Sequence, residues 1–114
     1  MSKRTPRLYL QDILDSIEKI EQYTEGMKFA DFKKNRMAQD AVIRNIEIIG
    51  EASSNLPKRL TNEYPHVPWK SMKGMRNLAI HEYFGVDINI TWKTIRKSLP
   101  KLKPVIEAAL ASIG

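Results

Sequence analysis

The chain has 114 residues, of which 42% are hydrophobic and 28% charged, with 19 lysines and arginines, 13 aspartates and glutamates, and no cysteine. This length suits one domain with a true hydrophobic core, so we expect a single domain over residues 1–114. The lack of cysteine excludes disulfides, thiolate metal sites and a cysteine nucleophile. A metal could use only His66, His81 and carboxylates, and no HExxH motif exists, so we expect no metal and no cofactor.

Two further features limit where the protein acts and what it contacts. No apolar run approaches the roughly 18 residues of a membrane span, and the N-terminal sequence MSKRTPRLYLQ lacks the apolar stretch of a signal peptide. We therefore expect a cytoplasmic protein with no membrane partner. The net charge of +6 favours attraction to polyanions, although charge alone does not identify one.

The first predicted helix begins at Thr5-Pro6, an N-cap residue followed by a proline suited to the first turn. Gly26 is expected to close it. One side of this helix is predicted to face the core. The residues that recur there at helical spacing are Leu10, Ile13, Leu14, Ile17, Ile20 and Thr24.

A second, longer helix is predicted from near Ala30 or Asp31 to about Leu56. Its apolar stripe consists of Ala38, Val42, Ile46, Ile49, Ala52 and Leu56. Ile43 and Ile48 lie outside the stripe, which indicates a central position or a subunit contact. Between them runs a polar strip of Arg44, Glu47, Glu51 and Asn55. Gly50 costs roughly 1 kcal/mol in a helix interior, so it indicates a close helix crossing.

The rest of the chain continues the helical pattern. Prolines at 57, 65 and 68 mark a connecting segment with one helical turn around 58–63. A helix over 69–84 should bend at Gly74 and end at Gly85, and Asp87 should cap the next one. Two apolar stripes follow: the first is Ile88, Trp92, Ile95 and Leu99, and the second is Leu102, Ile106, Ala109, Leu110 and Ile113. Between them, Pro100 or Pro104 is expected to restart or kink the helix. The sum is an all-α, up-and-down bundle of four to five helices.

The most informative stretch is residues 74–84, which places Arg76, Asn77, His81 and Tyr83 on one short helix. Each has a structural explanation by itself, but together they suit phosphodiester cleavage. An imidazole can take a proton from a ribose 2′-hydroxyl or give one to the leaving oxygen. A guanidinium binds phosphate oxygens in pairs and stabilises developing charge. RNA supplies its own nucleophile, so this reaction needs no metal.

The helical wheel adds a geometric constraint. Tyr83 falls about 20° from Arg76, whereas His81 falls about 140° away, beside Asn77. One phosphate cannot easily sit between Arg76 and His81 on a straight helix. Either the helix bends, or a second copy across a two-fold axis completes the site, which favours a homodimer.

These residues resemble a known family. The run Arg76-Asn77-Leu78-Ala79-Ile80-His81-Glu82-Tyr83 is similar to the Arg-x4-6-His motif of HEPN-domain ribonucleases, and more closely to the Arg-x4-His-x-Tyr motif of the HepT toxins of HepT/MNT toxin–antitoxin systems. Further similarity lies in residues 44–52 (RNIEIIGEA), 64–69 (YPHVPW) and 84–87 (FGVD). It covers essentially the whole chain.

The resemblance implies a HEPN-like helical bundle that dimerises with both motifs at the interface. It implies a metal-independent endoribonuclease toxin of a type VII-like pair, with tRNA among its substrates and a 2′,3′-cyclic phosphate product. Arg76 and His81 would carry the reaction and Asn77 would support them. Tyr83 would be the hydroxyl to which the MNT nucleotidyltransferase antitoxin attaches AMP.

Other residues have open or weaker roles. Lys70, Lys73 and Arg44 are candidate RNA-binding residues, and Glu47 and Glu51 could either orient Arg76 or pair with Arg44. Core packing is the preferred interpretation of both tryptophans, and a loop position that of His66. A solvated face is the preferred interpretation of seven other basic residues, which are Lys33, Lys34, Arg36, Lys58, Arg59, Arg96 and Lys97. The alternative function is a non-catalytic module that binds nucleotide or RNA for a minimal nucleotidyltransferase partner.

Overall fold

The computed structural model describes residues 5–65, 67–70, 72–73 and 88–113, and every regular element in these ranges is a helix. The elements are α1 (Pro6–Tyr23), α2 (Phe29–Lys34), α3 (Arg36–Ser54), α4 (Lys58–Glu63), α6 (Ile88–Lys93), the π-helical segment η1 (Thr94–Ser98) and α7 (Leu99–Ile113). The all-α prediction is confirmed. The single-domain assignment of 1–114 stays a prediction.

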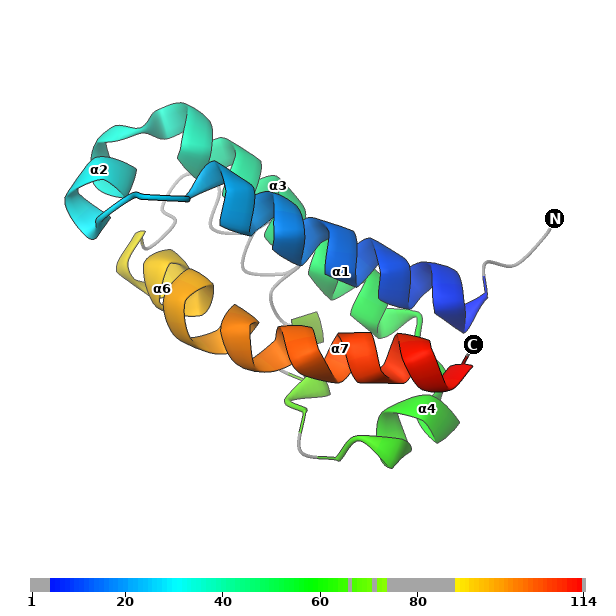
Figure 1. Ribbon diagram of the computed structural model, residues 1–114. Helices are drawn as coiled ribbons and strands as arrows, with labels where there is room; N and C mark the ends of the chain where they lie inside the picture. Colours follow the sequence, from blue (N-terminus) through cyan, green and yellow to red (C-terminus); the bar gives the residue numbers. More distant parts are fainter. Residues whose placement is uncertain (1–4, 66, 71, 74–87, 114) are drawn as a thin grey trace, which may run out of the picture.

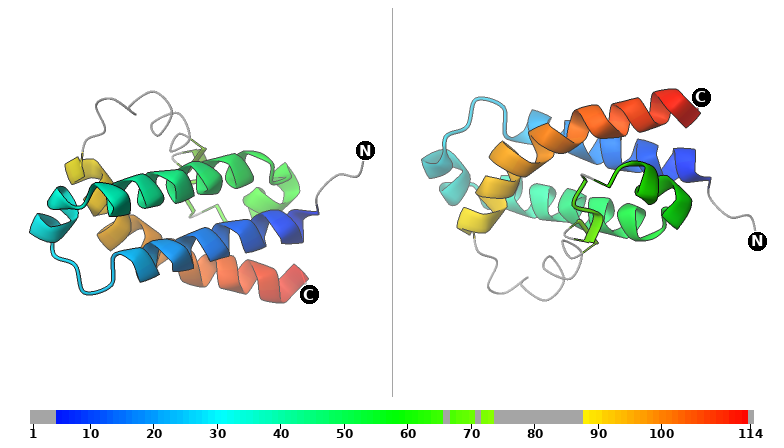
Figure 2. Two further views of the ribbon diagram at one scale, coloured as in Figure 1. Left: turned by 90° about the horizontal axis from the view of Figure 1, so that it is seen from above. Right: turned by 90° about the horizontal axis from the view of Figure 1, so that it is seen from below.

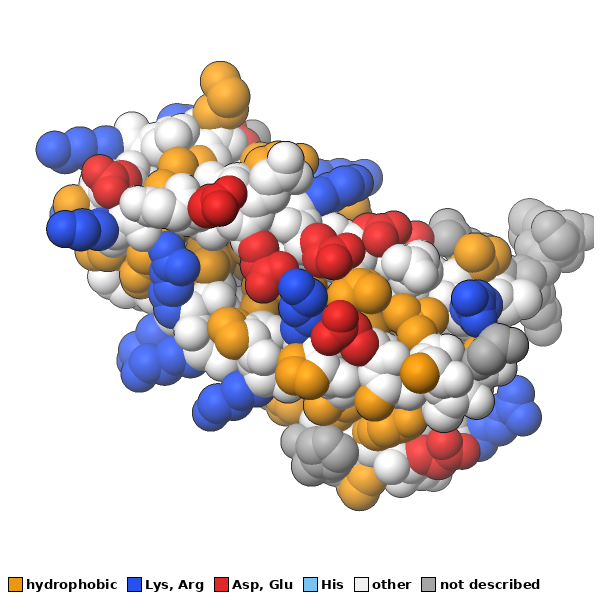
Figure 3. Space-filling view, viewed as in Figure 1, with side chains coloured by type: hydrophobic (Ala, Val, Ile, Leu, Met, Phe, Trp, Pro, Cys, Tyr) orange, Lys and Arg blue, Asp and Glu red, His pale blue; other side chains and the backbone are white. Residues whose placement is uncertain are grey.

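The three long helices lie along the long axis of a body of 40 × 27 × 26 Å (Figure 1). α1 packs against both α3 and α7 and runs antiparallel to them (Figure 2). α2 and α6 meet at one end of the molecule, and α4 and the start of α1 lie at the other. Lys and Arg side chains gather at the end formed by α2 and α6, whereas Asp and Glu side chains are prominent along the middle of this face (Figure 3).

α1 forms as its sequence predicts. The Thr5 hydroxyl accepts a hydrogen bond from the backbone N–H of Leu8 (3.3 Å), and Pro6 occupies the first turn. The α1 stripe is buried, with Leu14 half-buried at its edge. The helix ends at Tyr23, and Gly26 turns the chain with φ = +74°, a backbone conformation that favours glycine.

The prediction of one helix from about residue 30 to Leu56 is wrong, because the chain breaks at Asn35. The Asn35 backbone is extended (φ −104°, ψ 91°), and its Oδ1 accepts a hydrogen bond from the N–H of Ala38 (3.0 Å). Gln39 Nε2 donates to the carbonyls of Phe32 and Lys33, which close α2. Apolar spacing does not reveal this break, because the hydrogen bonds that produce it come from the polar side chains of Asn35 and Gln39.

This capping role makes a prediction for stability. Asn35→Ala removes the side-chain acceptor at the start of α3, so we expect the free energy of unfolding to fall by about 1 kcal/mol. Asn35→Asp keeps an acceptor oxygen and should retain most of the stability. Urea denaturation followed by circular dichroism measures both variants, and equal loss in the two would mean that the cap contributes nothing.

The stripe predicted for α3 is confirmed, since all six residues are buried together with Gly50. Ile43 and Ile48 are half-buried at its two margins. The helical turn predicted around 58–63 is α4. No helix in the described part of the chain combines the length and apolarity that a membrane crossing needs.

Of the restart or kink predicted at Pro100 or Pro104, the restart is wrong and the kink stays a prediction. α6, η1 and α7 follow one another without a break, and both prolines lie within α7. A proline lacks the N–H of the helical ladder and crowds the preceding turn. Directly before Pro100 the backbone forms a wider π turn, and this change in hydrogen-bonding pattern accommodates the proline within a continuous helix. The final stripe is buried through Leu102, Ile106 and Ala109, but Ile113 is 39% exposed.

Two side chains connect the C-terminal helices to the rest of the bundle. Arg96 donates a hydrogen bond to the carbonyl of Met27 (2.6 Å) after α1, and its guanidinium carbon lies 4.3 Å from the centre of the Trp92 ring. Lys103 Nζ donates to Glu21 Oε1 (2.8 Å), and this hydrogen bond raises the pKa of Lys103.

Candidate functional site

Arg76, Asn77, His81 and Tyr83 lie in the segment 74–87, outside the described residues. So do the predicted bend at Gly74, the helix end at Gly85 and the cap at Asp87. The structure describes the chain on both sides of this segment, together with the face of α3 that carries the other candidate residues.

The chain that leads into the motif segment is held by Trp69. Its indole N–H lies within hydrogen-bonding distance of the carbonyls of Thr61 (3.2 Å) and Tyr64 (3.0 Å), and the side chain is 9% exposed. Core packing of Trp69 is therefore confirmed, and Met72 is buried as well. Lys70 and Lys73 are both exposed on this helical stretch. Their ammonium groups are thus available to a polyanion directly before the motif.

The chain that leaves the motif segment enters α6, which is anchored by Trp92. The Trp92 ring packs against Phe32 (5.2 Å between ring centroids) and Phe29 (6.1 Å), both on α2. Core packing is confirmed for this tryptophan too. The two flanks of the motif are therefore fixed to the bundle by an aromatic side chain each.

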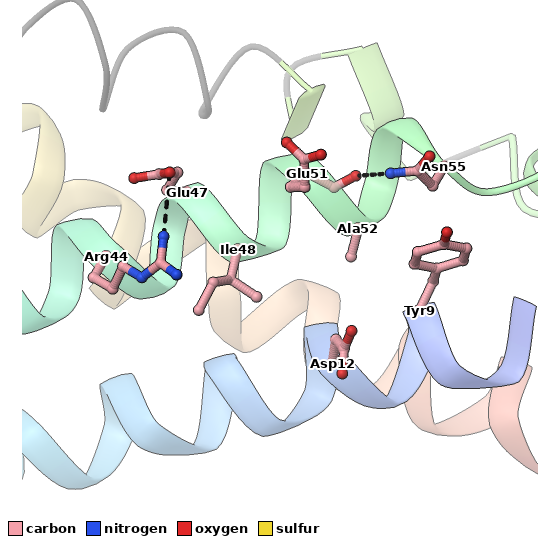
Figure 4. A pocket seen from close by; sticks show the side chains of 8 residues that line it. All are labelled: Tyr9, Asp12, Arg44, Glu47, Ile48, Glu51, Ala52 and Asn55. Carbon is pink, nitrogen blue, oxygen red and sulfur yellow. Dashed lines mark hydrogen bonds and ion pairs between the residues drawn. The ribbon is translucent and has the colours of Figure 1, made fainter. Parts of the chain in front are cut away.

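The polar strip of α3 lines a groove of about 510 Å³ between α1 and α3 (Figure 4). Its wall on α3 comprises Arg44, Glu47, Ile48, Glu51, Ala52 and Asn55, and its wall on α1 comprises Tyr9 and Asp12. The strip that helical spacing predicted is therefore one continuous surface. It combines a cation, carboxylates and a phenol around an apolar patch at Ile48.

Arg44 and Glu47 form an ion pair within this groove. The distance from Arg44 Nη1 to Glu47 Oε1 is 3.2 Å, and the two side chains are 66% and 35% exposed. Of the two roles left open for Glu47, the structure places it beside Arg44. An exposed ion pair of this kind stabilises the fold by less than about 1 kcal/mol. Arg44 or Glu47 can therefore leave it to pair with a more strongly bound group.

Glu51 lies one turn farther along α3, and its backbone carbonyl accepts a hydrogen bond from Asn55 Nδ2 (2.9 Å). Its carboxylate is exposed along the same groove. A role in orienting Arg76 stays a prediction for Glu51.

Sequence reasoning missed the α1 wall of the groove. Tyr9 and Asp12 stand three residues apart and are both half-buried, the spacing of neighbours on one helix face. The available signal was a tyrosine beside the apolar stripe of α1. The sequence could not show that α3 would face this tyrosine, because that depends on tertiary packing. In the described ranges, no three histidine, aspartate or glutamate side chains gather as a metal site would require.

Comparison with known proteins gives a consistent result. A family model described as "Ribonuclease HepT-like" matches residues 13–109. The chain is 46% identical over 105 residues to "Probable ribonuclease HepT" of Thermococcus cleftensis, which covers 92% of this chain and 96% of that protein. It is 44% identical over 107 residues to "Putative RNase TTE0752" of Caldanaerobacter subterraneus subsp. tengcongensis, covering 94% and 96%.

A third relative is longer. The chain is 48% identical over 104 residues to "Gamma-glutamylcyclotransferase and putative RNase MJ0434" of Methanocaldococcus jannaschii, covering 91% of this chain. It spans only 47% of that protein's length. No solved structure matches the chain.

Proposed function

Because the chain belongs to the HepT-like ribonuclease family, we propose that it is an endoribonuclease that cuts RNA with Arg76 and His81. The membership confirms the resemblance that the sequence motifs indicated. The observation that carries the proposal is that the match over 13–109 runs through the segment holding the Arg-x4-His-x-Tyr motif. The relatives' names as ribonucleases support RNA as the substrate.

The proposed chemistry is transesterification within the RNA strand. His81 removes the proton of a ribose 2′-hydroxyl or protonates the leaving 5′-oxygen, a task suited to a group whose pKa lies near neutrality. Arg76 stabilises the charge that develops on the phosphorane oxygens, and Asn77 supports these two. The 2′-oxygen attacks the adjacent phosphorus and the bond to the 5′-oxygen breaks, which leaves a 2′,3′-cyclic phosphate. The nucleophile belongs to the substrate, so we propose a metal-independent reaction.

Total tRNA tests this function directly. Incubation with the purified protein should produce discrete fragments on a denaturing gel. Saturable binding without any fragment would overturn the nuclease proposal and favour the alternative, a non-catalytic nucleotide- or RNA-binding module that serves a nucleotidyltransferase.

The proposal includes a homodimer that completes the site. Arg76 and His81 point about 140° apart on a straight helix, so a second copy would supply the missing partner for each phosphate. The groove between α1 and α3 supports this arrangement, because it places the half-buried Ile48 among charged groups that can pair across an interface. The interface would include residues 69–84 and part of 44–51.

We therefore expect a dimer at micromolar concentration, with about 1,600 Å² of buried surface. Ile48→Lys should shift sedimentation towards the monomer because it buries a charge in that interface. Met37→Lys is the matched control, since Met37 is apolar and 82% exposed outside this groove. A wild-type monomer at this concentration would contradict the proposal.

The biological role that we propose is that of a toxin in a type VII-like toxin–antitoxin pair. The MNT-type nucleotidyltransferase antitoxin would transfer AMP to Tyr83, and tRNA would be the RNA attacked. On the helical wheel Tyr83 falls about 20° from Arg76, so a continuous helix would put the modification on the same side as the phosphate-binding cation.

A further inference from the structure

The positive charge of the chain is concentrated in two segments. Residues 28–36 and 88–103 hold nine of the 19 lysines and arginines but only one of the 13 acidic residues, Asp31. These segments therefore carry a net +8 and the rest of the chain −2, with histidines neutral. Between Ile88 and Lys103 there is no acidic residue at all.

The fold brings the two segments together at one end of the bundle. Residues 28–36 span α2 and the start of α3, and 88–103 span α6, η1 and the start of α7. Trp92 packs on Phe29 and Phe32, and Arg96 binds the Met27 carbonyl just before α2. We call the resulting surface the basic end. Figure 3 shows the cationic side chains gathered there.

The π turn aligns part of the basic end into a row. Lys93, Lys97 and Lys101 follow at intervals of four residues, and all three are exposed. In a continuous α-helix each such step overshoots a full turn, so the three would drift around the axis. The wider turn at Thr94–Ser98 offsets that drift. The row extends over roughly 12 Å, a length along which a nucleic-acid strand presents several phosphates.

Most of these ammonium groups are not engaged within the protein. Arg36 pairs with Asp40 at 3.3 Å and Lys103 pairs with Glu21, whereas Asp31 accepts a hydrogen bond from the backbone N–H of Lys28 and not from its ammonium group. Among the described residues, no carboxylate pairs with the lysines that remain, which are Lys28, Lys33, Lys34, Lys93, Lys97 and Lys101. Arg96 differs from them, because its guanidinium is committed to backbone carbonyls and to the Trp92 ring.

We propose that the basic end is a binding surface for the RNA sugar–phosphate backbone, lying outside the Arg76–Tyr83 motif and used to hold substrate while the motif cuts it. This inference rests on the proposed function for the identity of the polyanion. Flexible lysines without acidic neighbours bind phosphates irrespective of sequence, by release of counterions. The basic end would therefore contribute affinity for RNA and hold it in position, but it would not recognise a particular base.

The experiment measures binding apart from cleavage. A fluorescent oligouridylate is titrated with the full chain carrying His81→Ala, so that the RNA stays whole, with or without Lys93→Gln, Lys97→Gln and Lys101→Gln. At about 0.1 M salt the triple variant should bind at least about tenfold more weakly. Its plot of log affinity against log salt should be flatter by about 2, because each lost single-strand phosphate contact removes about 0.7.

The matched control is Arg7→Gln, Lys58→Gln and Arg59→Gln. These three exposed cations lie at the opposite end of the molecule, at the start of α1 and on α4. Their substitution removes the same amount of positive charge as the lysine triple. The control should bind RNA within about twofold of the parent. Equal weakening in both triples would overturn the proposal, since net charge alone would then explain binding. Unchanged RNA affinity, together with lysine-dependent binding to anionic phospholipid vesicles, would overturn it in favour of a membrane surface.

Measuring the kinetics of RNA cleavage tests the basic end and the proposed function separately. With His81 present, the lysine triple should raise KM for tRNA and leave kcat nearly unchanged, since the substitutions remove uniform binding. Absence of cleavage in every form of the protein, the wild type included, would count against the proposed function while the binding result still decides the basic end.

Discussion

His81→Ala and Arg76→Ala should each reduce RNA cleavage by about 10²–10⁴-fold without unfolding the protein. The histidine variant loses the group that we propose to move protons to and from the ribose and the leaving oxygen. The arginine variant loses the cation that we propose to stabilise the phosphorane. Initial rates on tRNA measure both losses, and circular dichroism establishes that each variant is folded.

The chain supplies a matched control for each substitution. His66 is the only other histidine, so His66→Ala removes the same chemical group from a position expected to lie in a loop. Arg59 on α4 is exposed, and Arg59→Ala should likewise leave the rate within about twofold. Arg76→Lys adds a finer test, because lysine keeps the charge but cannot bind two phosphate oxygens in parallel. Full activity in folded His81→Ala and Arg76→Ala would contradict the assignment.

Tyr83→Phe should abolish modification by the cognate nucleotidyltransferase while leaving RNA cleavage intact. An AMP group on this hydroxyl adds a phosphate with about one negative charge and a bulky nucleoside. The phosphate would compete with the RNA backbone for Arg76, and the nucleoside would obstruct the approach of RNA to that arginine. Both effects are local, so the modified protein should remain dimeric but inactive.

Mass spectrometry after co-expression with the antitoxin tests this switch. The wild type should gain one or more AMP units on Tyr83, and the phenylalanine variant should gain none and stay toxic. Tyr23→Phe is the control, because Tyr23 is a tyrosine 39% exposed at the end of α1. An adduct elsewhere, or neutralisation of Tyr83→Phe without any adduct, would indicate inhibition by complex formation instead.

Local sequence signals predicted much of the fold. Thr5-Pro6 begins α1, and the apolar spacing from Ala38 to Leu56 identifies the buried face of α3, because both depend on neighbours in the same helix. The break at Asn35 was missed because a capping side chain competes with helix propagation through hydrogen bonds that spacing does not reveal. The continuity through Pro100 was missed because it depends on the π turn before it.

The candidate surfaces show a similar division. Spacing alone placed Arg44, Glu47 and Glu51 on one face, and the structure gives that face its second wall from α1. Within the basic end, the sequence favoured a solvated face for Lys33, Lys34, Arg36, Arg96 and Lys97. Their assembly at one end depends on the contact of Trp92 with Phe29 and Phe32 across about sixty residues of sequence, which no local pattern encodes.

Analysis of the RNA ends left by cleavage in EDTA tests the central claim most directly. The purified protein is incubated with tRNA in excess chelator, and the fragments are treated with a phosphatase before and after opening of any cyclic phosphate. Attack by the 2′-hydroxyl, assisted by Arg76 and His81, predicts undiminished cleavage with 2′,3′-cyclic phosphate and 5′-hydroxyl ends. Cleavage that stops in EDTA and returns with Mg²⁺, or fragments with 3′-hydroxyl and 5′-phosphate ends, would contradict it.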